Sequence, residues 1–240
     1  MTSSAAPLSA LPVPLGHCRF AVVDVETTGA GAQSGGRVIE IAVAILERGT
    51  VHLAFDALID PGTPIPPWVT HLTGITNAQV AGRPRFAHIA TGLLRALEDG
   101  VFVAHNARFD WRFLAAECVA ADVPAPAGAP LCTVRLTRRL APELRHRGLD
   151  YVTAFFGIEN PARHRAFGDA LATARVLRVL LARARERGVE TLEQLVDLHE
   201  RPRHRVRSAE CAVRSGNLGT DRGSTFPVNS ALRTPRSALE

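Results

Sequence analysis

Short runs of apolar residues in the first part of the chain are typical of β-strands. Four such runs predict strands, at residues 19–26, 37–47, 51–59 and 101–104. Gly49 and Thr50 form the expected turn between the second and third runs. The proline-rich stretch 61–67 interrupts the pattern and is predicted to be a loop. The early part of the chain should therefore supply most of a β-sheet.

Further along the chain the period changes, and apolar residues recur every three or four positions. This period predicts amphipathic helices, at residues 86–98, 107–121, 134–140, 149–157 and 166–187. Asn106 is expected to cap the second of these helices. Thr191 and Gln194 predict a capping box for a short last helix that ends at His199. Because one strand is inserted among the helices, the element order predicts an α/β domain with a mixed sheet.

The chain of 240 residues is long enough for one domain of ordinary size with tails. Residues 1–17 are rich in Ala, Pro and Ser and are expected to be a disordered leader. The folded domain is expected over 18–187, followed by a short helix within 188–200. Periodicity then ends, and residues 201–240 are predicted to be a disordered, arginine-rich tail.

All 28 basic residues of the chain are arginines, and their distribution is uneven. Residues 201–240 hold eight arginines and three acids, so this segment accounts for 8 − 3 = +5, which equals the formal net charge of the whole chain. The folded part is therefore balanced, and the basic character describes the tail, which we expect to be solvated and uninvolved in catalysis.

Composition also excludes several classes of protein. No apolar run reaches 18 residues, so neither a membrane-spanning helix nor a membrane partner is expected. The first residues lack the positive charge of a secretory signal. The four cysteines form no C-x-x-C pair, which argues against a zinc site and a disulfide framework and favours the reducing cytoplasm; they are Cys18, Cys118, Cys132 and Cys211.

Four acidic residues lie in or beside apolar segments, where an isolated carboxylate is costly to bury. Asp24 and Glu26 are two apart on a predicted strand, so their side chains share one face. Asp110 lies in the first turn of a helix that follows a buried strand, and Asp169 lies in the first turns of the last long helix. Each segment alone has an ordinary structural explanation. Together, four converging carboxylates suit a pair of divalent metal ions.

His164 precedes Asp169 by five residues, or about 500° of helix rotation, so the two side chains would not share a face on one continuous helix. We therefore place His164 on the preceding loop. A histidine in such a position is suited to remove a proton from an attacking water. A solvent-exposed histidine with no role is the ordinary alternative, since the chain has nine histidines.

The segments that hold these residues resemble the three motifs of the DEDDh family, the DnaQ-like 3′–5′ exonucleases. The motifs are Asp24 to Gly29 (DVETTG), His105 to Asp110 (HNARFD) and His164 to Ala170 (HRAFGDA). A further family segment resembles Leu72 to Thr76 (LTGIT). The resemblance covers residues 18–185 and is strongest to the proofreading exonucleases of bacterial DNA polymerase III, either the epsilon subunit or the domain within PolC.

This resemblance implies a ribonuclease H-like fold with a five-stranded mixed sheet flanked by helices. It also implies that two Mg²⁺ or Mn²⁺ ions are held by four acids, namely Asp24, Glu26, Asp110 and Asp169. His164 would be the general base. Arg165 stands where the related DEDDy branch has a tyrosine, so the histidine branch fits. The family also suggests a pocket for the terminal nucleotide, lined by Thr28, Leu72, His105 and Phe109.

The expected function is a metal-dependent 3′–5′ exonuclease that releases nucleoside 5′-monophosphates from DNA, in proofreading or repair. Its partners would be single-stranded or frayed 3′ ends and a DNA polymerase subunit. Two alternatives stay open at this point. One is an exoribonuclease similar to RNase T or oligoribonuclease, because metal ions and backbone phosphates are common to both substrates. The other is a non-catalytic module of a polymerase complex.

Overall fold

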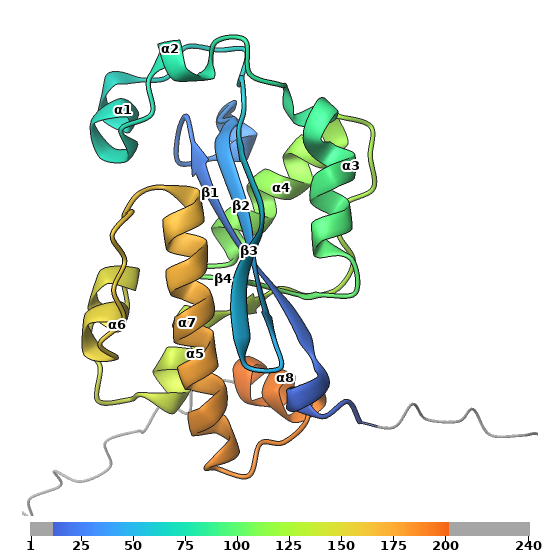
Figure 1. Cartoon of the computed structure of the whole chain (residues 1–240), viewed down its shortest axis with the longest axis vertical. Coiled ribbons are helices and arrows are strands. Elements are labelled where there is room, and N and C mark those ends of the chain that lie inside the picture. The colour runs from blue at the N-terminus through green and yellow to red at the C-terminus, as the bar shows by residue number, and fades with distance from the viewer. Residues whose placement is uncertain (1–11, 202–240) are drawn as a thin grey trace, which may run out of the picture. The chain divides into compact units, whose positions relative to one another are not determined.

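Five strands form one mixed sheet in the computed structural model, which describes residues 12–201. The strand order is β3-β2-β1-β4-β5, and the strands are β1 (Arg19–Thr27), β2 (Val38–Glu47), β3 (Thr50–Leu58), β4 (Val101–Ala104) and β5 (Leu131–Cys132). The first three strands are antiparallel, whereas β4 and β5 run parallel to β1. The predicted five-stranded mixed sheet is confirmed (Figure 1).

Helices cover both faces of this sheet (Figure 1). One face packs against the long helix α7 (Ala166–Arg185), with α5 (Thr133–Leu140), α6 (Leu149–Phe155) and α8 (Leu192–Glu200) around it. The other face packs against α3 (Phe86–Leu97) and α4 (Arg108–Ala120). The remaining helical segments are α1 (Pro67–Thr73), α2 (Asn77–Val80) and two short 3-10 turns, η1 (Leu15–His17) and η2 (Ala32–Ser34). No helix among residues 12–201 is long and apolar enough to cross a membrane.

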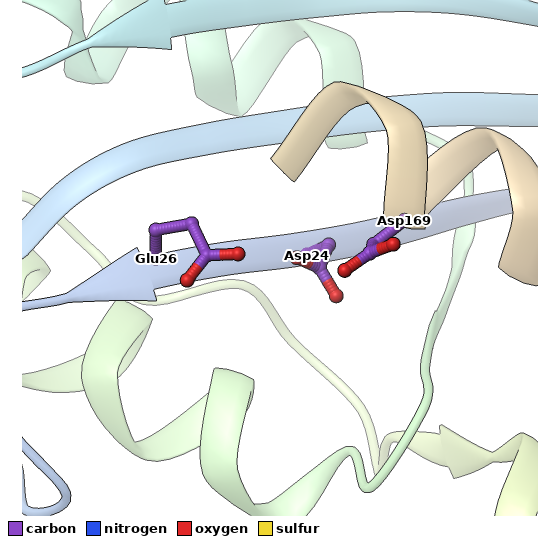
Figure 2. A group of neighbouring side chains, drawn as sticks. All are labelled: Asp24, Glu26 and Asp169. Atoms are coloured by element: carbon purple, nitrogen blue, oxygen red, sulfur yellow. The ribbon is translucent and has the colours of Figure 1, made fainter. Parts of the chain in front are cut away.

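The side chains of β1 alternate between the two cores, as expected for a strand buried on both faces. Phe20 and Val22 pack in the core beneath α7, whereas Ala21, Val23 and Val25 pack in the core beneath α3 and α4. Asp24 and Glu26 continue the first series. Their side chains therefore leave the sheet together on the α7 side, and the prediction that they share one face is confirmed (Figure 2).

Small residues let α7 approach the sheet closely on this face. Ala42 and Ala44 of β2 are fully buried against the helix residues Ala166, Ala170 and Ala174. Without longer side chains between them, the backbones of α7 and the central strands come close together. The start of α7 is thereby placed over the part of β1 that carries the two acids.

The predicted leader is too long by six residues. Residues 12–17, expected to be disordered, pack onto the segment before α8: Leu15 is buried and its amide donates to the Glu190 carbonyl at 2.8 Å, while the Leu192 amide donates to Val13. Burial of Leu15 explains this order. The remaining parts of the predicted tails, 1–11 and 202–240, lie outside the described residues.

Two local expectations differ from the structure, and one strand, β5, was not predicted. Asn106 does not cap α4: the N-cap is Ala107, and Asn106 has a left-handed backbone with φ of 74°. The predicted loop ends in α1, whose first residue is Pro67, a residue that suits the first turn of a helix. The two-residue strand β5 is too short to show a period. The capping box of Thr191 and Gln194 is confirmed.

The three cysteines within the described residues are free and buried; they are Cys18, Cys118 and Cys132. Cys211 lies outside those residues.

Candidate active site

Three of the predicted acids meet where β1 passes beneath the start of α7. The carboxylates of Asp24, Glu26 and Asp169 each offer an oxygen atom, and these atoms all lie within 4.8 Å of one another. Figure 2 shows Asp24 and Glu26 on the strand and Asp169 on the helix, with the carboxyl groups gathered between them. Residues that are 143 or more positions apart in sequence are therefore brought to one point by the packing of α7 on β1.

The negative charges of this cluster are poorly compensated within the protein. Burial raises the pKa of Asp24 well above its usual value, and the charges of Asp110, Asp169, Glu26 and Glu40 raise it further. Burial also raises the pKa of Glu26 to about 8, with the charge of Asp169 as the next cause, and only Arg165 acts in the opposite direction. Such a set of oxygens attracts a positive charge.

Asp110 is buried in the first turn of α4, as the sequence predicted, but it does not belong to the group of three. Burial raises its pKa to about 7, against the effect of two backbone amides, its own and that of Val25 in β1. Its charge nevertheless raises the pKa of both Asp24 and Glu26. Asp110 therefore contributes to the negative potential of the site.

Asp169 is held by the loop that precedes α7. One of its carboxylate oxygens accepts a hydrogen bond from the Asn160 side-chain amide at 2.5 Å, and the other accepts from the backbone amide of His164 at 3.2 Å. Burial raises the pKa of Asp169, and these hydrogen bonds oppose that rise. Asn160 was not predicted, because no periodic pattern marks a loop asparagine.

His164 lies on this loop, as expected, immediately before Arg165, the N-cap of α7. Its backbone is left-handed, with φ of 57°, which is uncommon for a residue other than glycine. The loop is packed tightly against the helix, since a Cβ atom on Gly168 would lie 2.1 Å from the Ala162 carbonyl oxygen. His164 is thus half-buried beside the acidic cluster on a closely fitted segment.

A fifth acid, Glu40 on β2, was not predicted. It lies opposite Glu26 in the β1–β2 ladder and is only 1% exposed. Its carboxylate binds Arg165 and the start of α7. In the sequence, Glu40 is an acid within an otherwise apolar strand. A buried acid needs a partner, and this is the one signal that could have marked Glu40 as a residue with a role.

The four predicted pocket residues lie on different elements. Thr28 is buried after β1, with its hydroxyl accepting from the Arg37 amide at 2.9 Å. Leu72 is exposed on α1, and Phe109 of α4 is half-buried against Phe113. His105 follows β4, and both of its ring nitrogens are 2.8 Å from partners, the Thr133 hydroxyl and the Arg147 carbonyl.

The donor set is chemically suited to a divalent cation. The group of three offers only carboxylate oxygens, which are the ligands that Mg²⁺ and Mn²⁺ prefer. Burial raises the pKa of Asp24 and Glu26, and like-charge repulsion raises it further. A bound cation would offset both effects. The residues present therefore fit a divalent-metal site.

The chain is similar to known proteins in sequence and in fold. The family model described as "Exonuclease" matches residues 21–177, which is well over half of the chain. The 3′-5′ exonuclease DinG of Bacillus subtilis is 34% identical over 152 residues, covering 63% of this chain and 16% of that protein. The PolC-type DNA polymerase III of Streptococcus suis is 35% identical over 160 residues, covering 67% of this chain and 11% of that protein.

Among solved structures, exonuclease X in complex with a 5′-overhanging duplex DNA is similar in fold, with a TM-score of 0.58 and 27% sequence identity. The match covers 75% of this chain and 99% of that chain. The chain spans only a small part of the length of the two curated relatives, whereas it covers nearly all of exonuclease X. The chain therefore belongs to the exonuclease family, as its DnaQ-like motifs predicted.

Proposed function

We propose that the chain is a metal-dependent nuclease that hydrolyses DNA from the 3′ end to nucleoside 5′-monophosphates. The observation that carries this proposal is the meeting of Asp24, Glu26 and Asp169, within 4.8 Å, beside the loop of His164. Support for the 3′–5′ direction comes from similarity to DinG, which is named a 3′-5′ exonuclease. Support for DNA as the substrate comes from similarity to PolC-type DNA polymerase III and from the DNA in the complex of exonuclease X.

The acids of the site would hold two divalent ions, Mg²⁺ or Mn²⁺, with Asp110 completing the set of four carboxylates. When bound, these ions would stabilise negative charge on the scissile phosphate and make water a better nucleophile. Asp24 and Glu26 present their oxygens from a rigid central strand, and Asp169 presents its own from a helix that is packed on that strand. The protein thus fixes the ligand atoms before substrate arrives.

His164 would remove the proton from the attacking water. General-base catalysis of this kind typically contributes about 10²–10⁴-fold to the rate. The position of His164 on a loop, outside the helix that holds Asp169, lets the imidazole approach the cluster from a different direction. The Asp169 carboxylate accepts a hydrogen bond from the backbone amide of His164. This contact fixes the position of one proposed metal ligand relative to the residue that supplies the base.

The terminal nucleotide would lie against Thr28, Leu72 and Phe109. Leu72 is 48% exposed on α1, so its side chain is available to contact a base. His105 would support this pocket through its contacts with Thr133 and Arg147, since both ring nitrogens already have partners within the chain. A single-stranded or frayed 3′ end fits this proposal, and a DNA polymerase subunit is a second proposed partner, by analogy with PolC.

Cleavage of labelled oligonucleotides tests the function. Wild-type protein with Mn²⁺ should release labelled mononucleotide at once from a 3′-labelled single strand, and a ladder of shortened products from a 5′-labelled strand. Asp24→Asn, which keeps the shape of the side chain, should remove this activity. Asp197→Asn, at an exposed position on α8, is the matched control and should leave it unchanged.

Equal cleavage by wild type and Asp24→Asn would refute the proposal, as would release of mononucleotides from the 5′ end. A matched RNA oligonucleotide in the same assay addresses the alternative substrate. Faster trimming of RNA than of DNA would replace the DNA assignment with that of an exoribonuclease, while the role of the acids would stand.

A further inference from the structure

The buried acid Glu40 lies beside the acidic cluster, but it faces a different partner. Both of its carboxylate oxygens lie 3.1 Å from the Arg165 Nε, and Oε1 is also 2.5 Å from Arg165 Nη2. Oε2 accepts a further hydrogen bond from the Ala166 backbone amide at 2.7 Å. Since both oxygens are engaged, Glu40 is bound to the start of α7 and is not a spare ligand of the cluster.

These contacts fix the point at which loop and helix join. Arg165 is the N-cap of α7 and Ala166 is its first residue. A carboxylate at this position satisfies one of the free amides of the first turn and interacts favourably with the positive end of the helix dipole. The Arg165 carbonyl accepts a hydrogen bond from the Asp169 backbone amide at 3.0 Å. Arg165, which Glu40 holds, therefore also closes the first turn of α7, the turn that carries Asp169.

His164 is the residue directly before this anchor. Its left-handed backbone, with φ of 57°, persists only where the surroundings enforce it. Arg165 is held by Glu40 on one side, and its guanidinium lies 5.5 Å from the centre of the Phe167 ring. The backbone on the C-terminal side of His164 is therefore fixed by Glu40 of β2, the strand next to the one that carries Asp24 and Glu26.

We propose that the ion pair between Glu40 and Arg165 is a positioning device that sets the His164 imidazole against the acidic cluster. The inference rests on the proposed function, in which His164 is the base. Asp169 has a second source of order, because Ala166 and Ala170 pack α7 onto the sheet. Loss of the pair should therefore displace His164 more than it disturbs the metal ligands.

A double-mutant cycle tests this inference through kcat, measured with saturating Mn²⁺ on a 3′-labelled single strand. His164→Asn removes the base while tolerating the left-handed backbone. Glu40→Gln should lower kcat about 10–100-fold in the wild-type background, since small displacements of a catalytic group are costly. In the His164→Asn background the same substitution should change kcat by less than about two-fold, and Mn²⁺ affinity should be nearly constant.

Glu117 provides a matched control. It is 3% exposed, it binds the Nε and Nη2 of Arg37 at 2.8 and 2.7 Å, and it accepts the Val38 amide at 3.0 Å. Its arrangement is thus nearly identical to that of Glu40, but it supports a different segment. Glu117→Gln should have the same effect on kcat, whatever its size, in both backgrounds.

Two results would overturn the inference: an undiminished kcat in Glu40→Gln, or an equal loss in both backgrounds. If Glu40→Gln does not fold, Arg165→Met removes the same pair at a position that is 33% exposed. Hydrogen exchange gives a readout that does not need activity. Exchange over residues 160–168 should rise in Glu40→Gln but not in Glu117→Gln, and an unchanged rate would refute the inference. An inactive wild-type protein would refute the proposed function instead.

Discussion

The carboxylate of Asp169 accepts a hydrogen bond from the backbone amide of His164 at 3.2 Å. The proposed metal ligand and the proposed base are therefore linked through the main chain of His164. The imidazole takes no part in that hydrogen bond. A substitution at position 164 can therefore remove the imidazole while the support of Asp169 remains. This separation makes the two proposed roles distinguishable by experiment.

We expect His164→Asn to lower kcat about 10²–10⁴-fold, the range for loss of a general base. Mn²⁺ affinity should stay near that of the wild type, because the backbone amide that binds Asp169 is retained. Asp169→Asn should instead weaken Mn²⁺ binding as well. Calorimetric titration of Mn²⁺ beside single-turnover cleavage checks both, and a His164→Asn variant that loses its metal affinity would contradict the separation.

Asp24→Asn should raise the thermal stability of the metal-free protein while it abolishes cleavage. Burial and four neighbouring acids raise the pKa of Asp24, so its ionised form destabilises the fold at neutral pH. Each kcal/mol gained corresponds to about 2–4 °C in a domain of this size. Melting curves in the presence of EDTA measure the change, with Asp197→Asn as the neutral control. A lower melting temperature for Asp24→Asn would show that the carboxylate is compensated in some other way.

The stability of the metal-free protein should fall as the pH rises from 7 to 8.5. Because the pKa of Glu26 is raised from 4.5 to about 8, the folded protein binds more protons than the unfolded chain between these values. The destabilisation is complete above pH 8 and is relieved as the pH falls. Saturating Mg²⁺ should remove most of this dependence, since the cation takes the place of the protons.

Glu26→Gln should show a shallower dependence on pH than the wild type in the same melting experiment. Equal stability of the metal-free wild type at pH 7 and pH 8.5 would count against the shifted pKa of Glu26. The range above pH 7 is chosen because His199 stays neutral there.

His199 should make the fold sensitive to acid. Its Nε2 accepts the Cys132 backbone amide at 3.0 Å, and burial lowers its pKa to about 4. The unfolded chain therefore binds a proton that the folded protein excludes, and stability is lost as the pH falls from 6.5 towards 4. The loss should be on the order of 2 kcal/mol. In urea unfolding at pH 7 and pH 5, His199→Gln should lose less stability on acidification than the wild type does.

Gly168→Ala should impair the loop of His164. The added Cβ would lie 2.1 Å from the Ala162 carbonyl oxygen, so the loop or the helix must shift. Overpacking of this kind costs about 1–3 kcal/mol. We expect a lower melting temperature together with a reduced kcat. Gly92→Ala on α3 is the control, since its Cβ would meet only the Phe55 ring at an ordinary 3.4 Å.

Contacts that follow from local spacing could be predicted from the sequence. The alternation of β1 placed Asp24 and Glu26 on one face, and the break before α7 placed His164 on a loop and Asp169 on the helix. Asp110 was expected in the first turn of α4 and is found there. These are short-range consequences of strand and helix geometry.

Relationships that depend on register or on very short elements could not be predicted. Glu40 meets Arg165 only because the β1–β2 ladder sets Glu40 opposite Glu26 and α7 crosses that point; the two residues are 125 positions apart. The strand β5 and the helix α2 have two and four residues, too few to display a period. Asn106 has a residue type suited to capping, yet its backbone adopts the left-handed region instead.

The alternation within β1 has a consequence for how this protein can evolve. Insertion or deletion of one residue before Asp24 would move both acids into the apolar core beneath α3 and α4, and would turn Val25 towards the cluster. A change in the length of the strand would therefore disrupt the site, because it moves every later side chain to the other face of the sheet. Lineages of this domain should accumulate length variation in segments such as 121–130, between α4 and β5, while the number of residues from Arg19 to Glu26 stays constant.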